Sequence, residues 1–327
     1  MNQIILHQFS IALSACNITK KWLFVLCCLV CLAPHKSMAQ QDPLYTQYMF
    51  NTLAYNPAYA GSRDVLSIMA LSRHQWVGFD GAPSTQTLTA HSTVGKNVGL
   101  GFSILHDKLD PTRQTGVYFD YAYRLKISDK GKLSMGLKGG FNFYQNTLSQ
   151  LSTGSVGDDP ALSGSDYSKF LPNFGFGLYY YSPKFYLGAS APKLMENKLA
   201  NRDIETQGEV GKEVRHYFLT SGYVFGISKE VKLKPSVLAR FTQAAPVVMD
   251  LNVNFLFKEK LWLGGFYRIQ NSFGAIAQYQ FTQQFKVGYG FDMTTNELSN
   301  YNSGTHEIML LYEFSFTKEK VQHPRYF

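Results

Sequence analysis

The stretch VYFDYAYRLKI, residues 117–127, alternates between two kinds of side chain. Its odd positions are all apolar or aromatic, whereas its even positions include Asp120, Arg124 and Lys126. Successive side chains of a β-strand point to opposite faces, so a period of two predicts a strand with one apolar and one polar face.

The same period recurs along most of the chain after residue 64. Clear examples lie at 133–143, 174–180, 217–227, 231–241, 249–257, 261–269, 273–279, 285–291 and 308–316. Weaker ones lie at 65–73, 84–92, 97–107 and 184–190. Together with 117–127 they predict about 14 strands.

The length and charge pattern of these strands distinguish a membrane barrel from a soluble sandwich or propeller. Strands of about 9 to 12 residues suit a tilted bilayer crossing, whereas soluble strands cluster near about 5 to 6 residues. A Lys or Arg on the lipid face costs roughly 2–4 kcal/mol at the midplane. The charged side chains of the strands fall on the polar parity, namely Lys138, Arg240, Asp250, Arg268 and Glu313. We therefore predict an all-β fold, a transmembrane antiparallel β-barrel.

The links between the predicted strands alternate in length. Links after even-numbered strands are short, as at 128–131 and 258–260, whereas several after odd-numbered strands are long, notably 145–170, 190–215 and 292–305. Bacterial outer-membrane barrels have short periplasmic turns and longer extracellular loops. An even number of strands then predicts that both termini are periplasmic. We expect the last strand to end at Phe316 and residues 317–327 to form a basic periplasmic tail.

The N-terminal region has the pattern of a secretory signal peptide. Lys20 and Lys21 precede an apolar run at 22–33, and Ser37-Met38-Ala39 follows it, which predicts cleavage after Ala39. A lipoprotein cleavage box at 13–16 is the weaker alternative, because no cationic residue precedes it.

Removal of residues 1–39 would change the chemistry that the chain can carry. All four cysteines lie at or before Cys31, so the remaining chain could form neither a disulfide nor a thiolate metal site. The formal charge would fall from +8 to +5, because Lys20, Lys21 and Lys36 leave with the leader. This charge is spread along the chain, which argues against nucleic acid as a partner.

Residues 40–63 lack the period of two. Tyr45, Tyr48, Met49, Thr52 and Leu53 could line one side of a short helix that Asn56-Pro57 would end. We expect this segment to plug the barrel or to pack under its periplasmic rim, ahead of a barrel formed by residues 64–316.

No pattern indicates catalysis, a cofactor or a metal. The histidines are scattered, and neither a GxSxG nor an HExxH motif is present. Asp158, Asp159 and Asp166 in the loop 152–167 could ligate Ca²⁺, but they lack EF-hand spacing, and we expect a solvated loop.

Two unusual stretches resemble a known family. QDPLYTQYMFNTLAYNPAYAGS at 41–62 and RHQWVGFDGAP at 73–83, followed by AHS at 90–92, are similar to the opening of PorP/SprF proteins. The resemblance implies an outer-membrane barrel of the type IX secretion system of Bacteroidota. It also implies as partners a type IX secreted surface protein or adhesin, including those used in gliding, periplasmic secretion or peptidoglycan-anchoring proteins, and outer-membrane lipid.

These considerations predict a non-enzymatic barrel that assists secretion or surface attachment of type IX substrates, with a diffusive porin or small-solute channel as the alternative. Arg73, His74 and Gln75 would put polar groups at the pore mouth, and a hydrogen-bond network inside the lumen is the favoured interpretation over direct substrate contact. The candidates for partner contact are Tyr48, Phe50, Asn56, Pro57, Tyr59, Arg73, Gln75, Trp76 and Phe79.

Overall fold

The structure is a computed structural model that describes residues 43–147, 166–199, 212–243 and 245–314. The chain divides into two compact units. The smaller unit, residues 1–39 and 244–246, lies almost entirely outside the described residues. The larger unit, residues 40–243 and 247–327, contains the barrel. No helix of the described residues is long and apolar enough to cross a membrane.

Nearly all regular structure in the described residues is β-strand. The strands are β1 (Leu66–His74), β2 (Ser84–Val94), β3 (Val98–Leu109), β4 (Thr112–Lys126), β5 (Lys132–Asn146), β6 (Tyr167–Tyr181), β7 (Phe185–Ala191), β8 (His216–Tyr223), β9 (Phe225–Gly226), β10 (Val231–Thr242), β11 (Ala245–Phe257), β12 (Leu261–Arg268), β13 (Ser272–Gln280), β14 (Phe285–Thr294) and β15 (Thr305–Phe314). The helical turns are α2 (Thr52–Tyr55), η1 (Pro57–Tyr59) and η4 (Glu297–Tyr301).

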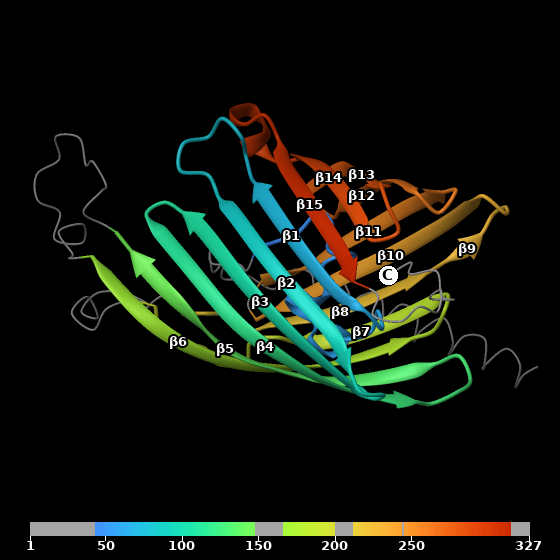
Figure 1. Ribbon diagram of the computed structural model, residues 1–327. Coiled ribbons are helices and arrows are strands. Elements are labelled where there is room, and N and C mark those ends of the chain that lie inside the picture. Colours follow the sequence, from blue (N-terminus) through green and yellow to red (C-terminus); the bar gives the residue numbers. More distant parts are fainter. Residues whose placement is uncertain (1–42, 148–165, 200–211, 244, 315–327) are drawn as a thin grey trace, which may run out of the picture. The chain divides into compact units, whose positions relative to one another are not determined.

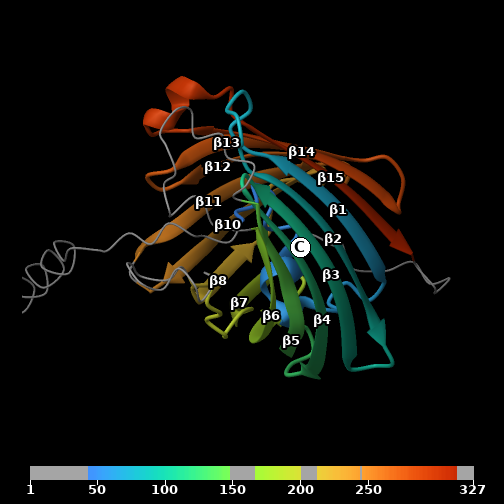
Figure 2. The ribbon, with the colours of Figure 1, turned by 90° about the vertical axis from the view of Figure 1, so that its left-hand side faces the viewer.

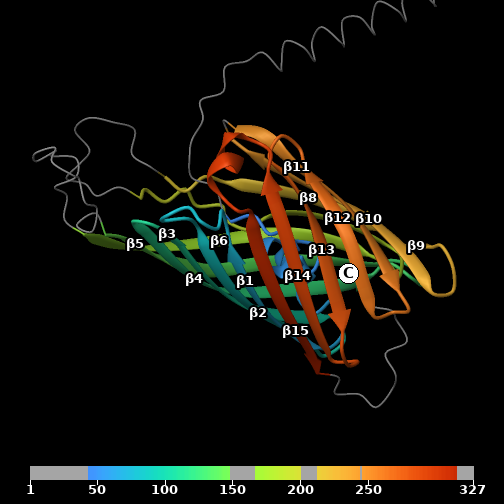
Figure 3. The ribbon, with the colours of Figure 1, turned by 90° about the horizontal axis from the view of Figure 1, so that it is seen from above.

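The strands form one closed antiparallel sheet (Figures 1 and 2). The first and last strands close it, with Leu66 opposite Phe314 and His74 opposite His306, and β15 and β1 lie side by side in Figure 3. The two-residue strand β9 continues β8 along the same neighbour, β10. Between them the buried Val224 donates its N–H to the Lys184 carbonyl at 2.8 Å. The result is a closed 14-strand barrel with one extra short strand, as predicted.

The two faces of the sheet differ as the alternation predicts. On β4, Phe119 is 61% exposed on the outside and its neighbour Asp120 is 3% exposed on the inside. The charged residues assigned to the polar parity are all buried inside the barrel, namely Lys138, Arg240, Asp250, Arg268 and Glu313. The outer surface is therefore mainly apolar, and these five charges face the lumen.

The links divide the barrel into two distinct ends. The end that we call the short-link end carries the links 95–97, 127–131, 182–184, 227–230, 258–260 and 281–284, and β1 begins and β15 ends there. The other end, the long-link end, carries the links 75–83, 147–166, 192–215 and 295–304, together with the tight links 110–111, 243–244 and 269–271. The predicted alternation of link lengths is confirmed, whereas the assignment of the short-link end to the periplasm stays a prediction. The expected strand end at Phe316, the tail and most of the loop 152–167 lie outside the described residues.

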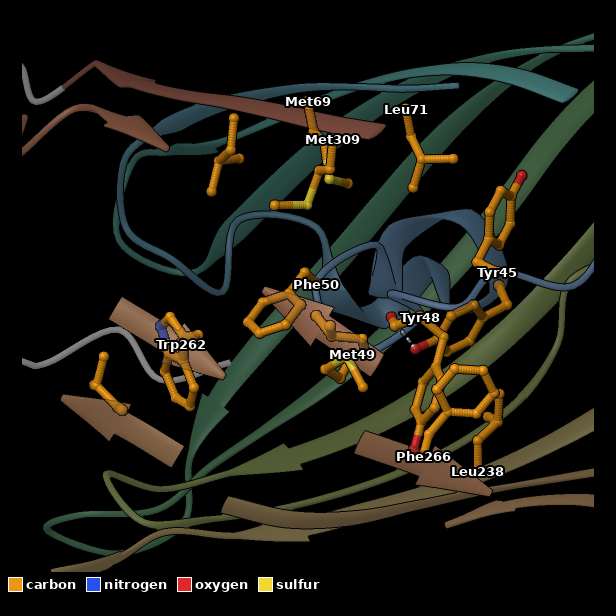
Figure 4. Close-up of a cluster of buried hydrophobic side chains, with 14 of the residues drawn as sticks. Tyr45, Tyr48, Met49, Phe50, Met69, Leu71, Leu238, Trp262, Phe266 and Met309 are labelled. Carbon is orange, nitrogen blue, oxygen red and sulfur yellow. Dashed lines mark hydrogen bonds between the residues drawn. The ribbon is translucent and has the colours of Figure 1, made fainter. Parts of the chain in front are cut away.

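Residues 43–63, which we call the lumen segment, lie inside the barrel, where almost every side chain is buried (Figure 4). The helix expected here is only the four-residue α2, followed after Asn56 by η1. Before α2 the chain forms single turns, with main-chain bonds from Phe50 to the Gln47 carbonyl at 3.0 Å and from Asn51 to the Tyr48 carbonyl at 3.1 Å. Residues 43–63 thus occupy the lumen, whereas residues 40–42 of the segment expected as a plug or rim lie outside the described residues.

Candidate functional site

At the long-link end, the lumen segment is bound by a buried network of charges. Glu307 accepts the backbone N–H of Thr46 at 2.9 Å and that of Gln47 at 2.8 Å. Arg73 contacts Asp292 at 3.0 Å and Glu307 at 3.3 Å, and it donates to the Thr46 hydroxyl at 2.6 Å. That hydroxyl in turn donates to Asp292 at 2.6 Å. One guanidinium and two main-chain donors thus compensate two carboxylates in a site closed to solvent.

The strand register explains why these groups meet. Arg73 on β1 lies opposite Glu307 on β15, and β14, which carries Asp292, is the next strand. A second ion pair lies on neighbouring strands, where Arg268 donates two hydrogen bonds to Asp250 at 2.6 and 2.9 Å. Buried charges are tolerated only when paired and hydrogen-bonded, and this arrangement meets that condition.

The lumen is also filled by an aromatic and aliphatic core, to which the lumen segment contributes Tyr45, Tyr48, Met49 and Phe50 (Figure 4). Phe50 of the lumen segment packs edge-on against Trp262 with 5.8 Å between ring centroids. The ammonium of the buried Lys234 lies 5.0 Å from the centroid of Phe50 and 5.8 Å from that of Trp262. Other members of this core are Met69, Leu71, Leu238, Phe266 and Met309.

The second half of the lumen segment crosses a row of small residues on the barrel wall. The row runs in register across β3 to β7, through Gly99, Ala122, Gly136, Gly177 and Ser190.

The segment follows this row residue by residue. Ser190 donates to the Tyr55 carbonyl at 2.7 Å. A Cβ at Gly136 would overlap the backbone of Ala58, and one at Gly99 would overlap the carbonyl of Ala60. The absence of side chains at the glycines of the row is therefore what lets the segment approach the wall so closely.

The lumen segment leaves the barrel at the short-link end through polar contacts. The carbonyl of Gly61 accepts from Arg124 at 2.6 Å and from Thr93 at 2.9 Å. Arg124 also pairs with Asp64 at 2.6 Å. Arg63 forms an ion pair with Glu313 near the end of the last strand. The segment thus traverses the lumen from the long-link end to the start of β1.

A cavity of about 70 Å³ remains beside the lumen segment. Pro43, Leu44 and Tyr45 line one side of it, and wall residues that include Tyr118 and Phe218 line the other. Within the described residues, no three His, Cys, Asp or Glu side chains are grouped so that they could bind a metal ion.

Comparison with known proteins identifies the family. The family described as type IX secretion system membrane protein PorP/SprF matches residues 37–312. The chain belongs to the PorP/SprF family. This confirms the resemblance of the two N-terminal stretches, and it identifies the molecule as an outer-membrane barrel of a secretion-system family. No curated protein sequence matches the chain.

Several solved outer-membrane barrels are similar to this PorP/SprF barrel. The toluene transporter TbuX of Ralstonia pickettii is 11% identical, with 81% of this chain and 93% of that chain covered and a TM-score of 0.47. Omp33 of Acinetobacter baumannii is 12% identical, with coverages of 76% and 98% and a TM-score of 0.45. A FadL homologue of Pseudomonas aeruginosa is 11% identical, with coverages of 85% and 96% and a TM-score of 0.43.

The candidates for partner contact in this PorP/SprF chain separate into two groups. Buried inside the barrel are Tyr48, Phe50, Asn56, Pro57, Tyr59 and Arg73. In the link 75–83, Gln75 and Trp76 are half-buried and Phe79 is exposed. Of Arg73, His74 and Gln75, only Arg73 is a member of the buried network described above, whereas His74 is exposed and bonds to Ser72 and Ser84. Of the two groups of candidates, only the second lies at the surface of the described chain.

The sequence reasoning missed several residues that bind the lumen segment. Asp292 and Glu307 lie at inward-facing positions of their strands, so the strand period predicts that they are buried. The same period does not predict that they bind Thr46 and Gln47 of the lumen segment. Gly99, Gly136 and Gly177 also lie on the inward face, and a row of small inward residues is the signal that would have indicated a close approach.

Proposed function

We propose that this PorP/SprF protein is a non-enzymatic outer-membrane barrel that assists the secretion or cell-surface attachment of type IX substrates, adhesins and gliding-related proteins among them, and couples to periplasmic secretion components. The observation that supports this proposal best is the filled lumen. A segment bound by buried ion pairs and packed into an aromatic core suits a rigid binding scaffold rather than a diffusive channel.

The exposed surface of the long-link end supports a role in binding an exported partner. Two of its links are joined by main-chain hydrogen bonds, from Val77 to the Gly304 carbonyl at 2.9 Å and from Ser303 to the Val77 carbonyl at 2.7 Å. Phe79 is 47% exposed and Tyr301 is 70% exposed on these joined links. Exposed aromatic side chains on a fixed backbone are typical anchors of protein interfaces.

The proposal is tested by deleting the gene and restoring it as wild type or as the variant Phe79→Ala/Tyr301→Ala. We expect the deletion and the variant to lose a surface protein that the wild-type gene restores, with unchanged permeability of the outer membrane. Phe281→Ala is the matched control, because Phe281 is 60% exposed at the short-link end. Equal amounts of each barrel in the membrane have to be shown by immunoblot.

Conductance separates this function from the porin alternative. Purified protein in planar bilayers is expected to give no large, stable conductance, because the lumen segment occupies the lumen. A large conductance independent of secreted protein, together with an unchanged set of surface proteins in the deletion strain, would contradict the proposal and favour a porin.

A further inference from the structure

The short-link end carries a ring of exposed lysines. Five of its six links carry exposed lysines, one each except for 258–260, which carries Lys258 and Lys260; the sixth, 281–284, has none. The ring is formed by five of them, one from each of these links. No ammonium group of the five pairs with an acidic side chain within the described residues. The five are Lys96, Lys130, Lys184, Lys229 and Lys260.

The acidic residues of the same end already have other cationic partners. Asp129 lies 3.5 Å from Lys126, and Glu230 lies 3.8 Å from Lys258. Glu259 pairs with Lys232. The five lysines are therefore a surplus of positive charge distributed around the circumference of this end.

The long-link end differs in how its cations are arranged. Lys108 pairs with Asp110 at 3.1 Å, and Lys212 pairs with Glu196 at 3.1 Å. Lys193, Lys198 and Lys212 all belong to the single link 192–215. Three lysines of this end thus lie on one link, and Lys108 and Lys212 are compensated by acids, whereas the five lysines of the short-link end lie on five different links.

Aromatic side chains fix the depth of the lysines relative to a membrane. Outward rings near the short-link end contact one another from strand to strand, as in Phe185 and Tyr223, with 6.5 Å between centroids, and Phe281 and Phe285, with 6.0 Å. Such rings mark the membrane–water interface of an outer-membrane barrel. Lys184 directly precedes Phe185, so its ammonium reaches the adjacent headgroup layer.

We propose that the short-link end binds anionic phospholipid headgroups through this ring of lysines, a role that is independent of the proposed secretion function. Lysine offers phosphate a mobile point charge that needs no preformed pocket, which suits a fluid lipid layer. A protein partner would contact one side of the rim and select a patch. One lysine per hairpin around most of the circumference suits the lipids that surround the barrel.

The test compares a short-link variant with a matched variant at the other end. In the first, Lys96, Lys130, Lys184, Lys229 and Lys260 are replaced by Gln. In the second, Lys108, Lys169, Lys193, Lys198 and Lys212 are replaced by Gln, which gives the same change of charge at the long-link end. Each protein is folded into vesicles of phosphatidylcholine alone and of phosphatidylcholine with phosphatidylglycerol, and the urea midpoint of unfolding is measured.

We expect phosphatidylglycerol to raise the midpoint of the wild type, and this gain to shrink at high salt, because exposed charges are screened. The short-link variant is expected to lose at least half of the gain, and the long-link variant to keep most of it. Inorganic phosphate added to phosphatidylcholine vesicles is expected to give no gain, which distinguishes headgroups from free phosphate.

Three results would overturn the proposal: no gain for the wild type, equal loss in both variants, or a gain that phosphate alone reproduces. If the five-lysine variant does not fold, the double variant Lys96→Gln/Lys229→Gln is compared with Lys108→Gln/Lys198→Gln in the same way. Lys96 lies between β2 and β3, and Lys229 lies between β9 and β10. None of these measurements involves a secreted protein, so their failure leaves the proposed secretion function unaffected.

Discussion

The two halves of the lumen segment are bound to the barrel by different physical means. Near the long-link end, Thr46 and Gln47 are fixed by charge, through Arg73, Asp292 and Glu307. Near the short-link end, residues 55–60 are fixed by shape, against the row of small residues that includes Gly99, Gly136 and Gly177.

The two halves therefore tolerate different kinds of substitution. A charge network depends on its composition, so removing one member leaves the others buried without compensation, whereas removing the whole set is milder. A close backbone contact depends on available space, so any added atom displaces the segment or the wall. The first half should therefore respond to mutation as a coupled set and the second half as independent positions.

The largest effect is expected for Arg73→Met. Arg73 is 1% exposed and Glu307 is 0% exposed, so the variant leaves two carboxylates buried without their cation. Breaking a buried ion pair typically costs about 3–5 kcal/mol. We expect the free energy of unfolding in lipid vesicles, measured by urea titration, to fall by that order.

Two further variants test whether charge coupling is the cause. Arg73→Met/Asp292→Asn/Glu307→Gln removes the carboxylates as well and is expected to recover part of the loss. Lys108→Met removes a pair that is exposed on both sides and is expected to change stability by about 1 kcal/mol or less. A triple variant that is less stable than Arg73→Met would show that the network does not act as a coupled set.

A smaller effect is expected for Gly136→Ala in the shape-fitted half. The new Cβ would overlap the backbone of Ala58, which η1 and its neighbours hold in place. Overpacking of this kind costs typically about 1–3 kcal/mol. The same urea titration, together with planar-bilayer conductance, would show the loss of stability and any displacement of the lumen segment.

Gly139→Ala is the matched control on the same strand. Nothing lies within 4 Å of the Cβ that this substitution would add. We expect it to be neutral. Equal destabilisation by both substitutions would mean that strand geometry, rather than contact with the lumen segment, explains these glycines.

The difference between the two halves also explains what could be read from the sequence. Alternation along β4 correctly assigns Phe119 to the lipid face and Asp120 to the lumen, because the strand period is a local property. Inward charges such as Asp250 and Arg268 follow by the same rule. The barrel and its approximate strand number were therefore predictable.

The path of the lumen segment was not predictable in the same way. Gln47 bonds to Glu307, 260 residues away, and periodicity carries no information about a contact of that separation. The helix expected around Tyr48 and Leu53 is reduced to single turns and the four-residue α2, because the segment follows the contours of the wall. The small inward residues gave a local signal of close approach, but not the identity of the segment that approaches.

The smallest effect is expected where the lumen segment leaves the barrel, at Asp64. Burial alone would raise the pKa of this carboxyl, but its hydrogen bond to Arg124 and the charge of Lys132 outweigh burial and lower the pKa below its usual value. A carboxyl whose pKa is lower in the folded state than in the unfolded state stabilises the fold. This contribution is fully present above the unfolded-state pKa of about 3.9, and it disappears as the pH falls through the folded-state pKa. Asp64→Asn should therefore lower stability at neutral pH and match the wild type in strong acid.

The side chain of Asp64 is 51% exposed, so solvent screening limits the difference at neutral pH to about 1 kcal/mol or less. Urea titrations of both proteins across the acidic range would measure it. Asp129→Asn is the control, because Asp129 is fully exposed, and we expect this substitution to leave stability unchanged. A stability difference for Asp64→Asn that grows as the pH falls would have the wrong sign, and it would exclude the ion pair with Arg124 as a stabilising contact at the exit of the lumen segment.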